Sequence, residues 1–255
     1  MEKDMRETTN IQLKRINRNR IYRTILARQE TSIQELAYGL QLSVPTVTQN
    51  LHELMEQGLI AENGTFASTG GRKAKVIASV PKAKIAIGID ITKNHITYVA
   101  LNLERTVLQL RRIKIAFAYT DEYLEKLNIG LEDLILRIGC ARECILGCGI
   151  SLPAIIASDE QTLQYAPILD WPKHLYEKIK EKIEIPMYFV NDANAGAVAE
   201  LAFGNTGKDF IYISLSNSVG GAIVTNSRLN SGQNYKSGEF GHMTLEENGL
   251  SCYCG

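Results

Sequence analysis

Two short segments place polar side chains where a ligand could meet them. Asn191 and Asp192 follow the apolar run Met187–Val190 and precede a run of small residues, a pattern typical of a strand that ends where a helix begins. A carboxylate there can accept a hydrogen bond from a ligand hydroxyl; the alternative is that Asp192 only caps the helix. The segment GEFGH brings a carboxylate, Glu239, and an imidazole, His242, close together between glycines. These residue types suit a binding site for a polar molecule.

A second group of short polar side chains stands at the start of a helix expected from Ser43 to Gly58. The helix has a predicted buried stripe, with Ser43 as its cap and a proline in its first turn. The stripe consists of Val44, Val47, Leu51 and Leu54. The residues that could contact DNA are Ser43, Pro45, Thr46, Thr48 and Gln49. Since Gln can bond adenine and Thr can meet a thymine methyl group, these types suit a helix that reads base edges.

The elements around this helix predict a winged helix-turn-helix in residues 1–80. A first helix is expected from about Asn10 to Arg28 and a second from about Ser32 to Leu40, with Glu35 completing a capping box. The apolar stripe of the first helix consists of Ile16, Ile21, Ile25 and Leu26. Two short strands, at Leu59-Ile60 and Val76-Ile77, supply the wing. The alternative is a small helical domain that binds protein.

Charge supports DNA as the partner of this segment. Residues 1–80 hold 11 basic and 8 acidic residues, although the whole chain has a formal net charge of +0. The stretch 8–29 carries six basic residues and no acidic one, and we expect Arg18 and Arg20 to contact phosphates. Arg72 and Lys73 follow two glycines, which suits a segment that enters a narrow minor groove.

Residues 81–255 predict an α/β domain. Three closely spaced strand-like runs, expected to form an antiparallel meander, are followed by alternating helical and strand-like segments. Val80–Lys84 reads as the linker between the two domains. Cys140, Cys144 and Cys148 read as small apolar packing residues rather than metal ligands.

Taken in order, these motifs resemble the ROK family of repressors, open reading frames and kinases, and within it the sugar-responsive transcriptional repressors. The resemblance rests on the segments SVPTV, GGR, GIDI, NDAN, GEFGH and CYCG. It implies a sugar kinase/actin-like ATPase fold for the second domain. It also implies that a sugar or sugar phosphate contacts Asn191, Asp192, Glu239 and His242, that operator DNA is bound, and that the protein is a homodimer or higher homo-oligomer.

The alternative function is an ATP-dependent sugar kinase. The family's phosphate turns are rich in glycine, whereas Asp90 is followed here by Ile-Thr-Lys-Asn and the second turn reads Ser216-Asn-Ser-Val-Gly-Gly. Side chains at these positions crowd a bound phosphate. We therefore expect a non-enzymatic sugar sensor that does not bind ATP. A structural or protein-docking module is the third interpretation.

The resemblance also implies zinc. The family's site uses one His and three Cys, and the sequence offers His242, Cys252 and Cys254, so we expect weak zinc binding or none. Because the chain stops inside this motif, it reads as truncated. The polar first ten residues and the lack of an 18-residue apolar run predict no signal peptide and no membrane span, hence a cytoplasmic protein.

Overall fold

The computed structural model describes residues 2–66, 74–166, 169, 174–204, 206–216 and 218–251, with side chains from residue 11 onward. The chain divides into two compact units. Unit 1 comprises Met1–Ile85 together with Leu101–Thr106, and unit 2 comprises Ala86–Ala100 together with Val107–Gly255.

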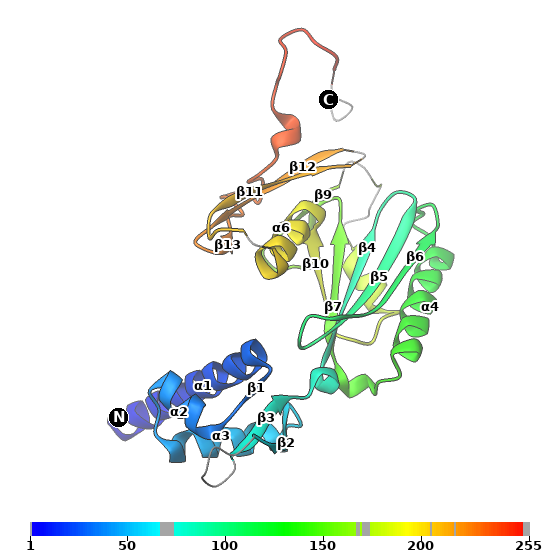
Figure 1. The fold of residues 1–255 in the computed structure, drawn as a ribbon. Coiled ribbons are helices and arrows are strands. Elements are labelled where there is room, and N and C mark those ends of the chain that lie inside the picture. The colour runs from blue at the N-terminus through cyan, green and yellow to red at the C-terminus, as the bar shows by residue number, and fades with distance from the viewer. Residues whose placement is uncertain are drawn as a thin grey trace. The chain divides into compact units, whose positions relative to one another are not determined.

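Unit 1 contains the three predicted helices, α1 (Glu2–Arg28), α2 (Ile33–Leu40) and α3 (Val44–Glu56) (Figure 1). The predicted capping box at the start of α2 is present. The backbone N–H of Ser32 donates to Glu35 Oε2 at 2.8 Å, and the backbone N–H of Glu35 donates to Ser32 Oγ at 3.3 Å. This reciprocal pair satisfies two of the amide groups that every helix N-terminus leaves without an intrahelical partner.

Three short strands complete unit 1. They are β1 (Glu30–Thr31), β2 (Ile60–Thr65) and β3 (Lys75–Ser79), in the order β1-β3-β2, and both pairs are antiparallel. Three helices followed by this hairpin form the predicted winged helix-turn-helix. The predicted minor-groove residues Arg72 and Lys73 lie outside the described residues.

The core of unit 1 corrects two predictions of burial. Ile21 and Ile25 of α1 are fully buried, and they pack with Leu36, Val47, Leu51, Leu54, Ile60 and Ile77. Ile16, predicted to join them, is 52% exposed because at 100° per residue it lies about 140° around α1 from Ile21. Val44 is 50% exposed because it is the first residue of α3.

Unit 2 is built on a five-stranded sheet in the order β10-β7-β4-β5-β6. Its strands are β4 (Ile85–Ile91), β5 (His95–Asn102), β6 (Val107–Lys114), β7 (Ile145–Leu152) and β10 (Met187–Asn191). The three-residue connection from β4 to β5 and the four-residue connection from β5 to β6 require antiparallel neighbours, as the meander predicts. β10 instead runs parallel to β7. Helix α4 (Asp121–Ile138) packs against β6, and α5 (Leu175–Lys180) precedes β10.

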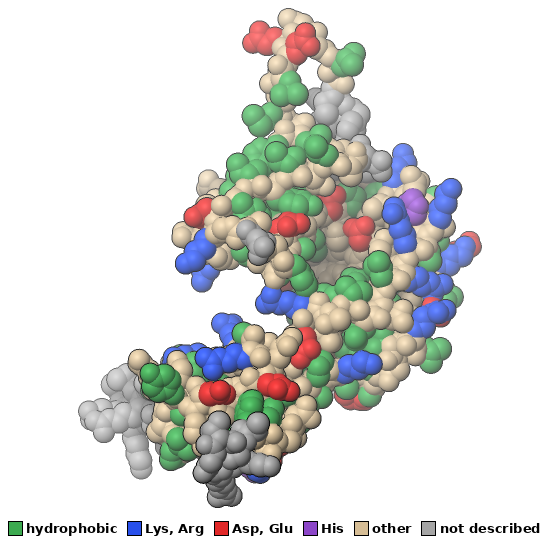
Figure 2. Space-filling view, viewed as in Figure 1, with side chains coloured by type: hydrophobic (Ala, Val, Ile, Leu, Met, Phe, Trp, Pro, Cys, Tyr) green, Lys and Arg blue, Asp and Glu red, His purple; other side chains and the backbone are tan. Residues whose placement is uncertain are grey.

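A second sheet of unit 2 has the order β11-β12-β13, with bounds Phe210–Leu215, Val219–Thr225 and Arg228–Leu229. Helix α6 (Asp192–Phe203) covers one face of it through a small core of Ala197, Ala222 and Val224. On β11 the alternate side chains Ile211, Ile213 and Leu215 are 60%, 55% and 78% exposed. Hydrophobic side chains are gathered over these strands in Figure 2. A two-stranded sheet, β8 (Ile155–Ile156) with β9 (Leu163–Tyr165), lies after β7 in the chain.

Two further observations concern the cysteines and membrane insertion. Burial raises the pKa of the Cys148 thiol to about 12, and Cys140 and Cys144 are half-buried, in agreement with their interpretation as packing residues. Among the described residues, no helix combines the length and the apolar character needed to cross a lipid bilayer.

One close approach between α4 and the sheet depends on a glycine. Tyr98 is fully buried on β5, and its hydroxyl donates to the carbonyl of Leu127 on α4 at 3.0 Å. A Cβ at Gly130 would overlap the hydroxyl end of this ring. Gly130→Ala should therefore destabilise unit 2 by about 1–2 kcal/mol, because an overpacking cost of about 2–3 kcal/mol exceeds the roughly 1 kcal/mol gained in helix propensity.

Urea unfolding followed by circular dichroism measures this change. Gly149→Ala, in a strand where an added Cβ meets nothing within 4 Å, is the matched control and should leave the stability almost unchanged. Equal stability of the two variants would show that Tyr98 is not held as described.

Candidate functional site

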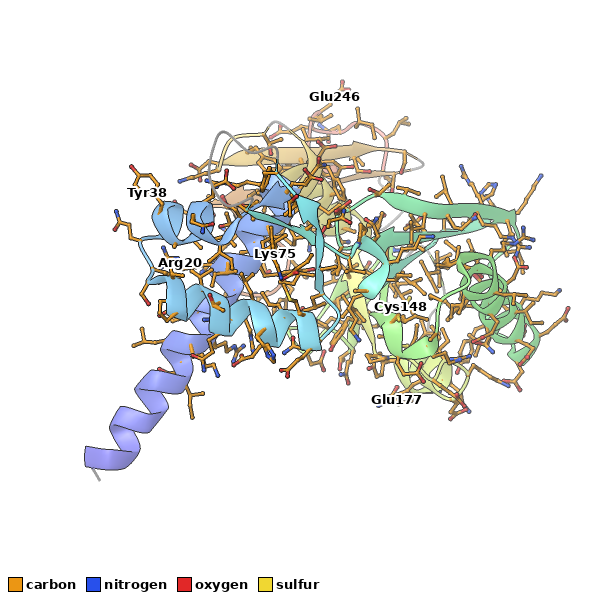
Figure 3. All side chains as sticks on the ribbon, turned by 60° about the horizontal axis from the view of Figure 1, so that its bottom comes forward. Arg20, Tyr38, Lys75, Cys148, Glu177 and Glu246 are labelled. Atoms are coloured by element: carbon orange, nitrogen blue, oxygen red, sulfur yellow. The ribbon has the colours of Figure 1, made fainter. Side chains whose placement is uncertain are left out.

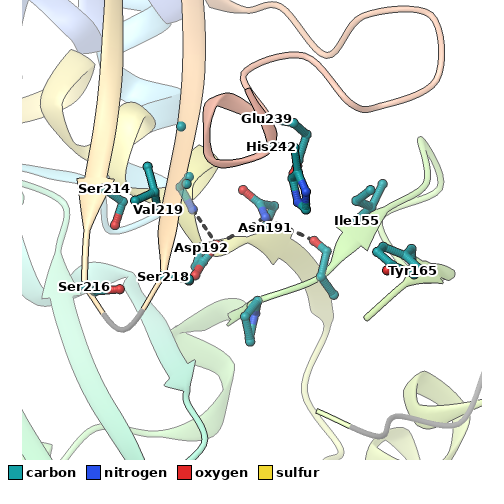
Figure 4. Close-up of a pocket in the computed structure, with 15 residues that line it drawn as sticks. Ile155, Tyr165, Asn191, Asp192, Ser214, Ser216, Ser218, Val219, Glu239 and His242 are labelled. Carbon is teal, nitrogen blue, oxygen red and sulfur yellow. Dashed lines mark hydrogen bonds and ion pairs between the residues drawn. The ribbon is translucent and has the colours of Figure 1, made fainter. Parts of the chain in front are cut away.

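A cleft in unit 2 brings together the four side chains singled out as ligand contacts (Figure 4). Asn191 and Asp192 come from the junction of β10 and α6, while Glu239 and His242 come from a short 3-10 segment, Phe240–His242, and the residue before it. The remaining lining residues are Pro153, Ala154, Ile155, Tyr165, Ala193, Ser214, Ser216, Ser218, Val219, Gly220 and Gly221.

Asn191, and not Asp192, is the N-cap of α6. The Oδ1 atom of Asn191 accepts the backbone N–H of Asn194 at 3.0 Å. Its Nδ2 group donates to the carbonyl of Ala154 and to Asp192 Oδ1, both at 3.2 Å. Because both amide hydrogens are used inside the protein, Asn191 holds the cleft in shape and can offer a ligand only an acceptor.

Asp192 is the first residue of α6, and its carboxyl group is largely buried. Its Oδ1 also accepts the backbone N–H of Ala193 at 2.9 Å. Burial raises the pKa of the Asp192 carboxyl, and the negative charges of Asp90 and Glu239 raise it further. Burial likewise raises the pKa of Asp90, which accepts a hydrogen bond from Ser151. The cleft is therefore acidic, and it offers hydrogen-bond acceptors to a ligand.

Glycines allow the segment that carries Glu239 and His242 to lie directly on β12. A Cβ at Gly241 would overlap the carbonyl oxygen of Val219, and one at Gly221 would overlap the ring of Phe240. Gly238 has φ +84°, a left-handed conformation that glycine adopts without strain. The resulting short turn places His242 Nε2 3.5 Å from Glu239 Oε2.

In the two turns where the family resemblance places a nucleotide phosphate, three backbone N–H groups are bonded within the turn itself. The N–H of Thr92 donates to the carbonyl of His95 at 3.0 Å, and the N–H of His95 donates to Thr92 Oγ1 at 3.1 Å. In the second turn the N–H of Ser216 donates to the carbonyl of Ser218 at 3.1 Å. These N–H groups are therefore not available to a phosphate.

The sequence did not single out the hydroxyls of the second turn as cleft residues. Ser214, Ser216 and Ser218 line the cleft from the hairpin of β11 and β12. Their spacing of two in a run that otherwise reads as a strand was the only available signal. Tyr165 and Ile155 were also missed, because they reach the cleft from β9 and β8, which are three and two residues long.

The start of α3 presents a second polar surface, in unit 1. Ser43 Oγ accepts the N–H of Thr46 at 3.2 Å and is 2.8 Å from Thr46 Oγ1, while Thr48 Oγ1 donates to the carbonyl of Val44. These hydroxyls thus make hydrogen bonds within the first turns of α3. Gln49 is exposed, and its side chain makes no hydrogen bond within the part of the chain that the structure describes. Of the predicted base contacts, Gln49 is the one whose hydrogen-bonding groups are fully available.

Three of the basic residues of α1 contact the other helices of unit 1. Lys14 and Arg18 both pair with Glu53 on α3, Arg18 at 3.3 Å. Arg20 donates to the carbonyl of Leu40 at the end of α2 at 3.2 Å. Arg18 and Arg20 therefore also position the helices, in addition to the phosphate contacts predicted for them.

Tyr38 on α2 was not singled out by the sequence, and its side chain extends into solvent with 89% exposure (Figure 3).

The zinc prediction falls mostly outside the described residues. Of the three candidate ligands, His242 is described, and Cys252 and Cys254 are not. The described residues contain no group of three His, Cys, Asp or Glu side chains that could hold a metal ion.

Comparisons with known proteins agree on both units. Residues 86–255 match the ROK family, and residues 24–62 match the bacterial regulatory protein, arsR family. The chain is 32% identical over 247 residues to a putative xylose repressor of Caldicellulosiruptor sp. (strain Rt8B.4), covering 95% of this chain and 62% of that protein. It is 30% identical over 249 residues to the xylose repressor of Bacillus subtilis (strain 168), covering 95% and 64%. The chain thus spans somewhat less than two thirds of the length of these relatives.

Among solved structures, a ROK family transcriptional regulator described as a homologue of the Escherichia coli MLC protein superposes with a TM-score of 0.74. The match covers 95% of this chain and 62% of that one at 23% identity, so it supports the fold.

The acidic cleft generates a prediction about stability. An Asp whose pKa is raised in the folded state destabilises that state at pH values above its folded pKa, and the penalty disappears below the unfolded value of about 3.9. Asp192→Asn should therefore stabilise the protein at pH 7 by roughly 0.5–2 kcal/mol, and the gain should shrink as the pH falls toward 4.

Urea unfolding at pH 7 and at pH 4.5 tests whether Asp192→Asn raises the free energy of unfolding and whether the gain is smaller at the lower pH. Asp159→Asn is the control with the opposite expectation, because hydrogen bonds from Thr162 and from the backbone N–H of Gln161 lower the pKa of Asp159. A loss of stability at pH 7 in Asp192→Asn would contradict the acidic description of the cleft.

Proposed function

The chain belongs to the ROK family, and from this premise we propose that it is a sugar-responsive transcriptional repressor of carbohydrate genes. In this proposal α3 reads operator DNA, and a sugar or sugar phosphate in the cleft changes the affinity for that DNA. The observation that carries the proposal is the pairing within one chain of a winged helix-turn-helix with a cleft of hydroxyl-binding side chains. Asp192 and Glu239 are the proposed acceptors, and His242 and Asn191 complete the site.

A sugar kinase is the rival function, and the turns argue against it. Phosphoryl transfer needs fixed donors around the phosphates of a nucleotide. The N–H groups of Thr92, His95 and Ser216 are used within their own turns. We therefore propose that the chain binds the sugar without phosphorylating it.

Assembly, metal and location complete the proposal. We propose a cytoplasmic protein that acts as a homodimer or higher homo-oligomer, because two recognition helices related by symmetry match the repeated half-sites of an operator. We also propose that His242, Cys252 and Cys254 can act as zinc ligands, since imidazole and thiolate are the usual ligands of structural zinc.

The recognition helix can be tested at Gln49. Gln49→Ala should reduce discrimination between the preferred operator and its single-base variants by about 1–3 kcal/mol, because a bidentate base contact is lost. Fluorescence anisotropy with a panel of substituted duplexes measures this change. Gln57→Ala, the same substitution at the other end of α3, is the control and should keep the specificity. Unaltered base preference in Gln49→Ala would refute the assignment.

Sugar response can be tested at Asp192. A sugar that binds the cleft should change operator affinity by about 5–150-fold, the usual range of coupling between two sites. Asp192→Ala should lose this response and keep its DNA affinity without sugar, whereas Asp159→Ala should keep both. A broad panel of sugars and sugar phosphates without effect on DNA binding would contradict the sensor. Transfer of phosphate from ATP to sugar by the same samples would favour the kinase.

A further inference from the structure

We infer that the cleft selects uncharged or positively charged sugars and rejects their phosphate esters. This inference rests on the proposed function and narrows it, because a sugar sensor could take either class. It is carried by the charges that line the described part of the cleft and by the hydrogen bonds already made at the start of α6.

No lysine or arginine lines the described part of the cleft, and its one imidazole, His242, lies 3.5 Å from the carboxylate of Glu239. Two carboxylates line it, Asp192 and Glu239, and the charge of Asp90 also acts on Asp192. Arg112 acts on Asp90 and does not line the cleft. A phosphate dianion placed among these carboxylates would meet repulsion without a lysine or arginine to offset it.

An adjoining hollow shows the same bias. It shares Ile155, Asn191 and Glu239 with the cleft, and its other lining residues are Ile156, Asn194, Ser231, Tyr235 and Ser237. All of these other residues are uncharged. Lys236 lies between two of them in the sequence and is exposed, but it does not line the hollow. A ligand that extends from the cleft into this hollow therefore meets neutral hydrogen-bonding groups.

The start of α6 is where an anion would normally bind, because the first N–H groups of a helix lack partners. In this chain two of those groups are occupied. The N–H of Ala193 donates to Asp192 Oδ1, and the N–H of Asn194 donates to Asn191 Oδ1. The protein's own carboxylate thus takes the position of an external anion.

The direction of the remaining hydrogen bonds also favours a hydroxyl ligand. Ionised Asp192 and Glu239 only accept hydrogen bonds, and both hydrogens of Asn191 Nδ2 are already donated within the protein. A sugar hydroxyl supplies the hydrogen that such acceptors need, and an ammonium group supplies three. A phosphate at neutral pH offers mainly acceptors. The donors left for it are the uncharged hydroxyls of Ser214, Ser216 and Ser218 and the imidazole of His242, which lies beside the carboxylate of Glu239.

Calorimetric titration of the full chain with matched pairs tests this selectivity. The pairs are glucose with glucose 6-phosphate and N-acetylglucosamine with its 6-phosphate, and glucosamine supplies a cationic ligand. For each sugar that binds, the phosphate ester should bind at least about tenfold more weakly at low salt, and glucosamine should bind at least as tightly as glucose. Equal or tighter binding of a phosphate ester would overturn the inference and leave the sugar sensor standing. If none of these ligands binds, the broad panel of sugars is tested in the same way with the phosphate esters, and binding of none of those would overturn the sensor and the inference together.

A charge-removing variant identifies the cause of the selectivity. Glu239→Gln should narrow the gap between sugar and phosphate several-fold, while Glu184→Gln, an exposed glutamate outside the cleft, should leave it unchanged. If Glu239→Gln binds no ligand at all, the cause is tested instead on the unmodified chain, by measuring how salt changes the affinity gap between sugar and phosphate ester. The gap should shrink between 0.02 M and 0.5 M salt, and a gap independent of salt would refute the electrostatic cause.

Discussion

The amide of Asn191 is the constraint on which the geometry of the cleft depends. One planar group joins the end of β10, the first turn of α6 and the loop at Ala154, and it also contacts Asp192. Each of these contacts uses a different hydrogen or lone pair of the Asn191 side chain. Together they fix the position of the backbone where β10 ends and α6 begins. The orientation of Asp192 follows from it, and so does the use of the N–H groups of Ala193 and Asn194 within the protein. Selectivity in the cleft is thus a consequence of how a helix begins.

Unit 1 depends on a comparable constraint at Glu53. This single carboxylate on α3 receives Lys14 and Arg18 from α1, which is why part of the basic segment faces the protein itself. Ion pairs that are partly exposed contribute little energy, so they add to a rotation of α1 against α3 that the shared apolar core of Ile21, Ile25, Val47 and Leu51 fixes. The same rotation decides which side of α3 remains open, and Gln49 lies on that side. Lys14 and Arg18, which belong to the basic segment that predicts DNA binding, therefore also link α1 to α3.

Local signals in the sequence predicted most of the fold, because caps and apolar periodicity act over three or four residues. Ser32 with Glu35 is an example, since both partners lie within one turn. Burial at helix ends was harder to predict, as Val44 shows, because the pattern does not say where the neighbouring core stops. The cleft residues at the GEFGH segment came from a recognisable motif. Ser214, Ser216 and Ser218 did not, since only the tertiary fold brings a hairpin tip to face the start of α6.

The three-stranded sheet of unit 2 has a physical consequence for handling the protein. Within the described residues β11 is an edge strand, it carries no charged side chain, and its apolar residues Ile211, Ile213 and Leu215 face solvent. Proteins usually protect such edges with lysine, proline or a bulge, none of which is present in β11. At a pI near 6.9 the chain also has almost no net charge to keep copies apart in neutral buffer. Association of copies along β11 will therefore limit the concentration at which this chain stays monodisperse in neutral buffer.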